Sequence, residues 1–467
     1  MDRIFRLQQN NTTVGREIIA GLTTFAAMAY ILVVNPSILK AAGMPQAALV
    51  TATAVGAAIS SILMGLLANF PLALAPGMGI NAFFAYTICL GMGIPWQSAL
   101  ALVFVNGCLF LILSVTGVRE QIVNALPISL KAAISVGVGL FIAFIGLKNG
   151  GLVIGSPATF VTMGDLSTPS VALFGAGLLI TCILVARGIP ASIIISMGVI
   201  TVLGLFVSDG KGGMVTNLPT SIVSFPSSIE PTFLKLDFNF LFNQPLKAVP
   251  VILTLLLVDM FDNIGTLIGV TKRAGLMSAD GRVPGLQKAL AADSIAAILS
   301  SLLGTSTVVS YIESATGVQA GGRTGLTSIT TAICFLLALI FTPLILTIPA
   351  VAAAPALVVV GILMFESVGE IDLTRFEAYA PAVLTLMAIP MTFSISTGIG
   401  IGLVSLAAIT LGTARPPGEP LSAARDAEYV HPQEKTTKLK GSGVTPFTYG
   451  LAVVFLLHFL GKALVPH

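Results

Sequence analysis

Charged residues are rare in this sequence. Lys, Arg, Asp and Glu make up 9% of its 467 residues, whereas a soluble domain carries roughly 25%. Hydrophobic residues reach 55%. A chain with so few charges cannot cover a water-facing surface, which excludes a soluble globular protein and indicates an integral membrane protein.

Cysteine and histidine are also rare. The chain has four cysteines, Cys89, Cys108, Cys182 and Cys334, which lie in apolar segments without CxxC spacing, and three histidines near its C-terminus. This pattern excludes a disulfide framework and suggests neither a zinc nor a haem site. We therefore expect no metal and no organic cofactor.

A cleavable signal peptide is not evident either. The chain opens with the polar, basic lead MDRIFRLQQNNTTVGRE, which is followed by a full-length apolar span. A secretory signal would have a short apolar region that ends at a small-residue cleavage site. We expect residues 1–16 to stay in the cytoplasm.

Long apolar stretches dominate the rest of the chain. They are about 17–25 residues long, the length of a transmembrane helix, whereas barrel strands have about 10 residues of alternating polarity. We predict an all-α polytopic membrane protein with fourteen transmembrane segments. Their predicted ranges are 17–35, 47–69, 71–91, 97–117, 127–147, 170–186, 189–207, 247–270, 285–304, 305–319, 324–346, 350–366, 378–395 and 396–413.

Basic residues support this count. With the N-terminus inside, most of the 23 lysines and arginines lie in loops that the fourteen segments place on the cytoplasmic side. The basic loop 271–288 could also bind anionic lipid or nucleic acid, but orientation alone explains its charge. We expect no nucleic-acid partner.

A polar connection at 208–246 divides the segments into two sets of seven. Because seven is odd, two halves that share a fold must be inverted relative to each other, as in many secondary transporters. The third segment of each half looks interrupted. Pro71 and Pro76 break the range 71–91, and a β-branched run precedes a helix-like stretch that begins near Ser310. We predict a short strand and then a half-helix in each, a pairing that marks transporter substrate sites.

Four acidic residues lie well inside the predicted spans: Asp259, Asp262, Asp293 and Glu313. Each costs at least about 2.5–3.5 kcal/mol at the bilayer centre, so each should face a cavity or a partner. Asp259 and Asp262 lie about 60° apart on one helix, where they could hold and release a proton or form a structural hydrogen-bond network. Glu313 falls in the first turn of the second half-helix, where it could bind a ligand or only cap the helix. We expect a structural role for Asp293.

Neutral polar and aromatic residues complete the candidate site. Asn81 opens the first half-helix, and its amide can both donate and accept hydrogen bonds at the edge of a heterocycle. Phe83 could stack on a planar ligand or pack in the core, as could Phe84 and Tyr86. Thr24 could face a ligand or bond to its own helix. The candidate substrate-binding residues are Glu313, Asp262, Asn81, Phe83, Thr24, Ser310 and Thr316, and the candidate proton-coupling residues are Asp259, Asp262 and Glu313.

Five motifs are distinctive: AGLTTFAAMAYILVVNP, LALAPGMGINAFFAY, VDMFDNIGTLIGV, GTSTVVSYIESATGVQAGGRTGLT and AAAPALVVVGILM. Together they resemble the adenine/guanine/hypoxanthine permeases, the azaguanine-type branch of the nucleobase cation symporter-2 family. The match runs from about residue 3 to about residue 413, and only the linker at 414–444 looks unusual for the family.

The resemblance implies the uracil-permease-type fold, with fourteen segments as two inverted repeats of seven. It also implies proton-coupled uptake of purine bases, often by a dimer. In the family pattern, the acids matched by Asp262 and Glu313 hold the base and couple the proton. Asp259 and Asn81 match polar residues of the purine branch. Because some adenine-preferring members have Asn at the position of Asp259, the acid favours hypoxanthine and guanine.

The resemblance also divides the chain into a core domain and a gate domain that move relative to each other, as in an elevator. The expected parts are residues 1–16, the cytoplasmic N-terminus; 17–117 and 247–346, the core; 127–207 and 350–413, the gate; 208–246, an extracytoplasmic connection; 414–444, a polar cytoplasmic linker; and 445–467, an apolar segment that either spans the membrane or lies at its interface.

We therefore expect a proton-coupled symporter that imports purine nucleobases across a bacterial inner membrane by alternating access, with sodium as the less favoured coupling ion. An anion exchanger on the same architecture is the alternative, although three buried acids disfavour an anion. An intramembrane aspartyl hydrolase is more remote, because that chemistry needs carboxylates on facing helices and Asp259 and Asp262 share one. We expect a transporter and not an enzyme.

Overall fold

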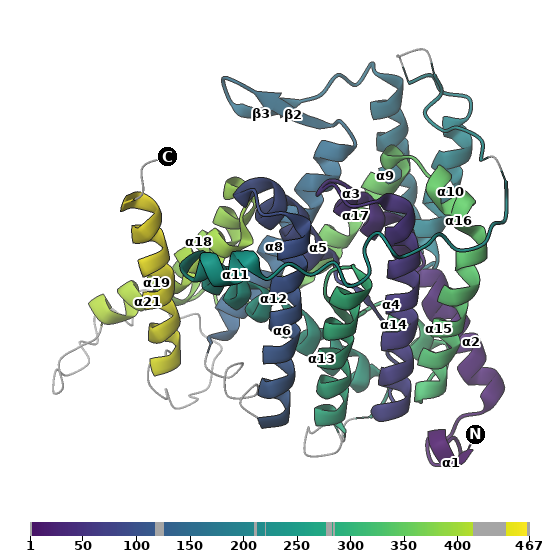
Figure 1. The fold of residues 1–467 in the computed structure, drawn as a ribbon, viewed down its shortest axis with the longest axis horizontal. Coiled ribbons are helices and arrows are strands. Elements are labelled where there is room, and N and C mark those ends of the chain that lie inside the picture. Colours follow the sequence, from purple (N-terminus) through teal and green to yellow (C-terminus); the bar gives the residue numbers. More distant parts are fainter. Residues whose placement is uncertain are drawn as a thin grey trace.

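The computed structural model describes residues 2–116, 126–209, 213–219, 221–276, 283, 285–413 and 445–464. The side chain of Asp262 and the predicted linker at 414–444 lie outside the described residues. The described chain is mostly helical (Figure 1).

Helices and two short strand pairs make up both halves of the chain. The N-terminal half contains α1 (Asp2–Phe5), α2 (Val14–Met28), α3 (Ile31–Lys40), α4 (Gln46–Leu67), β1 (Leu74–Pro76), α5 (Met78–Ala82), the π-helix η1 (Phe83–Gly91), α6 (Trp96–Thr116), α8 (Ile128–Asn149), β2 (Val153–Ser156), β3 (Phe160–Met163), α9 (Pro169–Ala186) and α10 (Ser192–Gly204). The C-terminal half contains α11 (Asn239–Asn243), α12 (Pro245–Arg273), α13 (Leu286–Leu303), β4 (Val308–Ser310), α14 (Ser314–Gln319), α15 (Gly325–Ala338), the 3₁₀ helix η2 (Leu339–Phe341), α16 (Thr342–Thr347), α17 (Ala350–Met364), the 3₁₀ helix η3 (Phe365–Glu370), α18 (Phe376–Thr392), α19 (Ile395–Thr413) and α21 (Pro446–Leu464).

Long apolar helices make this a multi-pass membrane protein. Within the described residues, nine helices are long and apolar enough to cross a membrane. Shorter apolar helices accompany them, at Met78–Gly91, Ser192–Gly204, Phe376–Thr392 and Pro446–Leu457. The expectation of a mostly helical, polytopic fold is confirmed.

The first predicted span, 17–35, lies within the apolar helical stretch Val14–Lys40, which contains a short turn. α2 ends at Met28 and α3 begins at Ile31, so that Ala29 and Tyr30 lie between two helices. The sequence does not predict this turn, because the apolar run across it is continuous. The β2–β3 hairpin, which projects from the upper edge in Figure 1, is likewise not predicted. Its strands have four residues each, too few to reveal a period of two.

The two predicted interruptions meet in space. β1 and β4 form an antiparallel pair in which Leu74 lies opposite Ser310, and the Gly77 N–H donates to the Thr307 carbonyl oxygen at 3.0 Å. Backbone N–H and C=O groups inside a bilayer need hydrogen-bond partners other than lipid. Here each interrupted segment supplies those partners to the other. A strand precedes each of the short helices α5 and α14, although α14 begins at Ser314 rather than near Ser310.

The long helices pack in two groups. The first group comprises α2, α4, α6, α13 and α15, in which α13 contacts α4 and α6, and α15 contacts α2 and α4. Four of these helices, α4, α6, α13 and α15, run side by side in Figure 1. The second group comprises α8, α9, α10, α17, α18 and α19, whereas α12 contacts both α6 and α19. In the first group, a Cβ atom on Gly325 would lie 2.0 Å from the Gly65 carbonyl oxygen, so this approach of α15 to α4 requires glycine.

The C-terminal apolar segment forms α21, which packs against α19 and α12. Phe455 of α21 is fully buried, and its ring faces Gly400 of α19. This segment is therefore docked on the helix bundle.

Candidate substrate site

The paired strands β1 and β4 bring candidate residues from both halves of the chain together. Glu313 is the residue that precedes α14, at the position of an N-cap, but its side chain makes no capping hydrogen bond. Instead, the hydroxyl of Tyr30 donates to Glu313 Oε1 at 2.5 Å. The Glu313 carboxylate is thus held by Tyr30, in the turn between α2 and α3, and not by a capping bond to α14.

Asp259 lies in a buried amide network on α12. Its Oδ1 accepts a hydrogen bond from Asn263 Nδ2 at 2.7 Å, and its Oδ2 accepts one from Asn106 Nδ2 of α6 at 3.3 Å. The Oδ1 atom of Asn263 in turn accepts the backbone N–H of Ser310 at 2.7 Å. A chain of hydrogen bonds therefore connects the predicted proton-coupling acid to the end of β4.

Several candidate side chains near the strands carry polar atoms that are buried without a partner among the described residues. Asn81 accepts a hydrogen bond from Ser306 through Oδ1, but its Nδ2 has no such partner. The same is true of Ser310 Oγ and Thr24 Oγ1. Thr24 borders α14 directly, because a Cβ atom on Gly317 would lie 2.0 Å from its Oγ1. Buried polar groups are usually hydrogen-bonded, so these atoms can serve a bound polar molecule.

The predicted aromatic residues differ in accessibility. Phe83 and Phe84 are fully buried in the main hydrophobic cluster, whereas Tyr86 is partly exposed. The ring of Phe83 therefore packs in the core in this structure. Thr316 donates to the carbonyl oxygen of Glu313 at 2.7 Å, which is a bond within its own segment.

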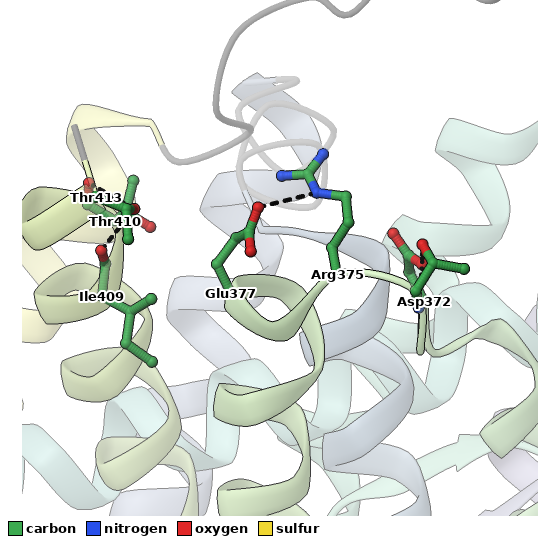
Figure 2. Close-up of polar contacts among 7 residues, drawn as sticks. Asp372, Arg375, Glu377, Ile409, Thr410 and Thr413 are labelled. Carbon is green, nitrogen blue, oxygen red and sulfur yellow. Dashed lines mark hydrogen bonds and ion pairs between the residues drawn. The ribbon is translucent and has the colours of Figure 1, made fainter. Parts of the chain in front are cut away.

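The hydrogen bonds described at the paired strands involve carboxylates, amides, hydroxyls and backbone groups. The ion pair between Arg375 and Glu377, at 3.1 Å, lies at the start of α18 on exposed side chains (Figure 2). Nearby, hydrogen bonds from the side chain and backbone of Thr374 hold the pKa of Asp372 below its usual value. Such exposed pairs contribute little to stability.

Three side chains that were not predicted from the sequence lie in buried hydrogen-bond networks. Tyr30 and Asn106 are the phenol and amide that contact Glu313 and Asp259. The signal was present in each case, since a polar group in the middle of an apolar span needs a partner. Glu17 is the third. It lies near the start of α2 and is fully buried.

Glu17 has a structural role. Its Oε1 accepts the backbone N–H of Arg323 at 2.9 Å, and its Oε2 accepts those of Thr324 and Thr327 at 3.2 and 3.3 Å. The Thr327 hydroxyl adds a bond of 2.6 Å. A carboxylate at the N-terminus of a helix satisfies amide groups that have no partner within the helix, so Glu17 anchors α15 to α2.

Comparison with known proteins gives consistent findings. The model of the Permease family matches residues 15–401. The adenine permease AdeP of Escherichia coli (strain K12) is 40% identical over 415 residues, which cover 89% of this chain and 91% of AdeP. The guanine/hypoxanthine permease PbuG of Bacillus subtilis (strain 168) is 41% identical over 469 residues, which cover 98% of this chain and 99% of PbuG.

A solved structure shows the same fold. The transmembrane domain of the cyanobacterium bicarbonate transporter BicA aligns with a TM-score of 0.60 and 16% sequence identity. The alignment covers 83% of this chain and 97% of that domain. At this identity the likeness concerns the fold alone.

Proposed function

The chain belongs to the Permease family, whose members are transporters and not enzymes, and we propose that it imports purine nucleobases such as hypoxanthine, guanine or adenine together with a proton. The observation that carries this proposal is the meeting of β1 and β4, which gathers Glu313, Asn81 and the Asp259 network at one buried place. The names of the adenine and guanine/hypoxanthine permeases among its relatives support the choice of substrate.

A purine offers ring N–H donors and ring nitrogen or carbonyl acceptors. We propose that Glu313 accepts an N–H of the base, and that Asn81 donates through Nδ2, which has no partner among the described residues. Thr24 and Ser310 supply hydroxyls beside them, with Thr316 on the next turn of α14. Stacking of Phe83 on the base requires that domain movement uncover its ring.

The Asp259 network suggests how a proton is held. Asn106 directs Nδ2 at the Asp259 carboxylate, and its Oδ1 has no partner among the described residues. Rotation of this amide by about 180° would present Oδ1 to a protonated Asp259, whose O–H could then donate to it. Asn263 would transmit the change to Ser310. We propose that Asp262 shares the proton or contacts the base, and that sodium is the less favoured coupling ion.

The two packing groups support a core and a gate. We propose fourteen segments as two inverted repeats, with the core at 17–117 and 247–346 and the gate at 127–207 and 350–413. The group of α2, α4, α6, α13 and α15 falls in the core, and the group of α8, α9, α10, α17, α18 and α19 falls in the gate. Elevator-like movement of the core would expose the site alternately in a homodimer of the bacterial inner membrane, with the N-terminus in the cytoplasm.

Uptake of radiolabelled hypoxanthine by cells that lack their own purine permeases tests the proposal. Glu313→Gln should lower uptake at least about tenfold, because a hydrogen bond to a charged group contributes about 1.5–3 kcal/mol. Asp259→Asn should abolish the dependence on the proton gradient. Glu377→Gln is the matched control, since it makes the same change on an exposed carboxylate.

Competition with adenine, guanine, hypoxanthine, xanthine and uracil would rank the bases, and surface expression must be equal for all variants. Wild-type uptake by Glu313→Gln, or uptake that ignores a protonophore, would contradict the assignment.

A further inference from the structure

We propose that Tyr30 is the positioning residue that fixes the Glu313 carboxylate for the incoming base. This inference rests on the proposed function and extends it to a residue of the first span. Tyr30 lies in the turn between α2 and α3, and its side chain is fully buried. Its hydroxyl donates to Glu313 Oε1 at 2.5 Å.

With Glu313 ionised, this contact is a charge-assisted hydrogen bond. Bonds of O–H to a carboxylate oxygen measure about 2.5–2.7 Å and are roughly twice as strong as neutral ones. A buried tyrosine hydroxyl normally finds one partner, and here that partner is Glu313, 283 positions along the chain. The bond therefore joins the turn in the first span to the residue that precedes α14.

Besides the bond from Tyr30, the Glu313 carboxylate is contacted by its own backbone N–H. It makes no capping bond to α14, and the hydroxyl of Thr316 contacts its backbone carbonyl rather than its carboxylate. The bond from Tyr30 commits Oε1 and leaves Oε2 to accept an N–H of the base. A carboxylate has about four acceptor positions, so Tyr30 and a base can bind at the same time.

A side chain that is held in its binding conformation before the ligand arrives improves affinity. A free glutamate side chain loses rotamer freedom when it binds a ligand, and a residue that already holds it removes most of that loss. Loss of the Tyr30 hydroxyl should therefore weaken binding about tenfold. The rate of domain movement should change little, because the hydroxyl contacts the carboxylate and not the gate.

Tyr311 offers a matched control. It is also buried, lies two positions before Glu313, and donates through its hydroxyl to the Pro76 carbonyl oxygen at 2.6 Å. Tyr311→Phe removes a hydrogen bond of nearly the same length that holds backbone rather than the carboxylate. A general loss of packing at the paired strands would affect both variants equally.

The test measures KM and maximal rate of hypoxanthine uptake at equal surface expression. We expect Tyr30→Phe to raise KM about tenfold with a maximal rate within about twofold of wild type, and Tyr311→Phe to raise KM clearly less. A wild-type KM in Tyr30→Phe, or an equal rise in both variants, would overturn the inference. A wild-type chain that takes up no purine would instead refute the proposed function.

A second variant tests the same contact from the other side. Glu313→Asp keeps the charge but withdraws the carboxylate by one methylene, so it should raise KM while Tyr30 is intact. On that background, adding Tyr30→Phe should change KM by less than about twofold, because coupled residues are not additive. A further tenfold rise in the double variant would show that Tyr30 acts through another group, and the inference would fail.

Discussion

Replacing Asn263 with alanine should cut the connection between Asp259 and the paired strands. The Asn263 side chain donates to Asp259 Oδ1 and accepts the backbone N–H of Ser310, each at 2.7 Å. All three residues are buried, with Asn263 and Asp259 exposing 0% and 1% of their surface. The substitution therefore removes two short hydrogen bonds and leaves a buried N–H without its acceptor.

The magnitude follows from these two bonds. A hydrogen bond to a charged group contributes about 1.5–3 kcal/mol, and a buried donor left unsatisfied costs about 1–3 kcal/mol. Water that enters the space of the lost side chain recovers part of this, so we expect a net loss of about 3–4 kcal/mol. Asn106→Ala removes a single, longer bond of 3.3 Å, and its Oδ1 has no partner among the described residues. We expect it to cost about 1 kcal/mol.

Thermal denaturation of the two purified variants in detergent provides the assay. Asn263→Ala should melt well below Asn106→Ala, and it should also lose hypoxanthine uptake, because the position of β4 depends on this bond. If the two variants melt together, or if Asn106→Ala is the less stable, the network does not connect Asp259 to Ser310 in the way the distances indicate.

Two further substitutions test the packing that holds the site. Gly317→Ala would place a Cβ atom 2.0 Å from Thr24 Oγ1, so α14 must move away from α2. We expect this variant to lose about 1–3 kcal/mol of stability in thermal denaturation. It should also lose most of its hypoxanthine uptake. Gly198→Ala, where nothing lies within 4 Å, is the control, and equal effects of the two would refute the close-packing argument. Glu17→Ala leaves the N-terminal amides of α15 without their carboxylate and should cost about 2–4 kcal/mol in denaturation. The exposed Glu377→Ala should cost less than about 1 kcal/mol, and a Glu17→Ala protein as stable as wild type would contradict the anchor.

Much of the fold could be predicted because a bilayer permits few structures. Apolar length alone locates the helices, and prolines such as Pro71 and Pro76 locate one interruption. The pairing of β1 with β4 could not be read from the sequence. An interruption requires hydrogen-bond partners for its backbone, but nothing in its residues specifies that they lie in the other half of the chain. The turn at Ala29 could not be predicted for a related reason, because the apolar residues on both sides of it continue a helical pattern.

The candidate site could be predicted where burial is most costly. Charged residues in a span stand out, which is why Asp259 and Glu313 became candidates. Neutral partners such as Tyr30, Asn106 and Asn263 carry a smaller penalty and also occur as packing residues. Their roles depend on which atoms lie within hydrogen-bonding distance, and that information appears only once the helices are packed.

Fold and substrate are determined by different features of this molecule. The chain shares its fold with the domain of a bicarbonate transporter, yet its paired strands hold the carboxylates of Glu313 and Asp259 in a network of amides and hydroxyls. An anion placed about 4 Å from one ionised carboxylate meets a repulsion of about 4 kcal/mol at an effective dielectric constant of about 20. A neutral base with N–H donors is attracted to the same carboxylate, and binding of a proton would reduce the remaining negative charge of the site. The sign of charge beside the strands therefore favours the proposed neutral heterocycle over an anion. Addition of bicarbonate or sulfate should leave hypoxanthine uptake unchanged, and competition by either anion at concentrations near the purine KM would reverse this conclusion.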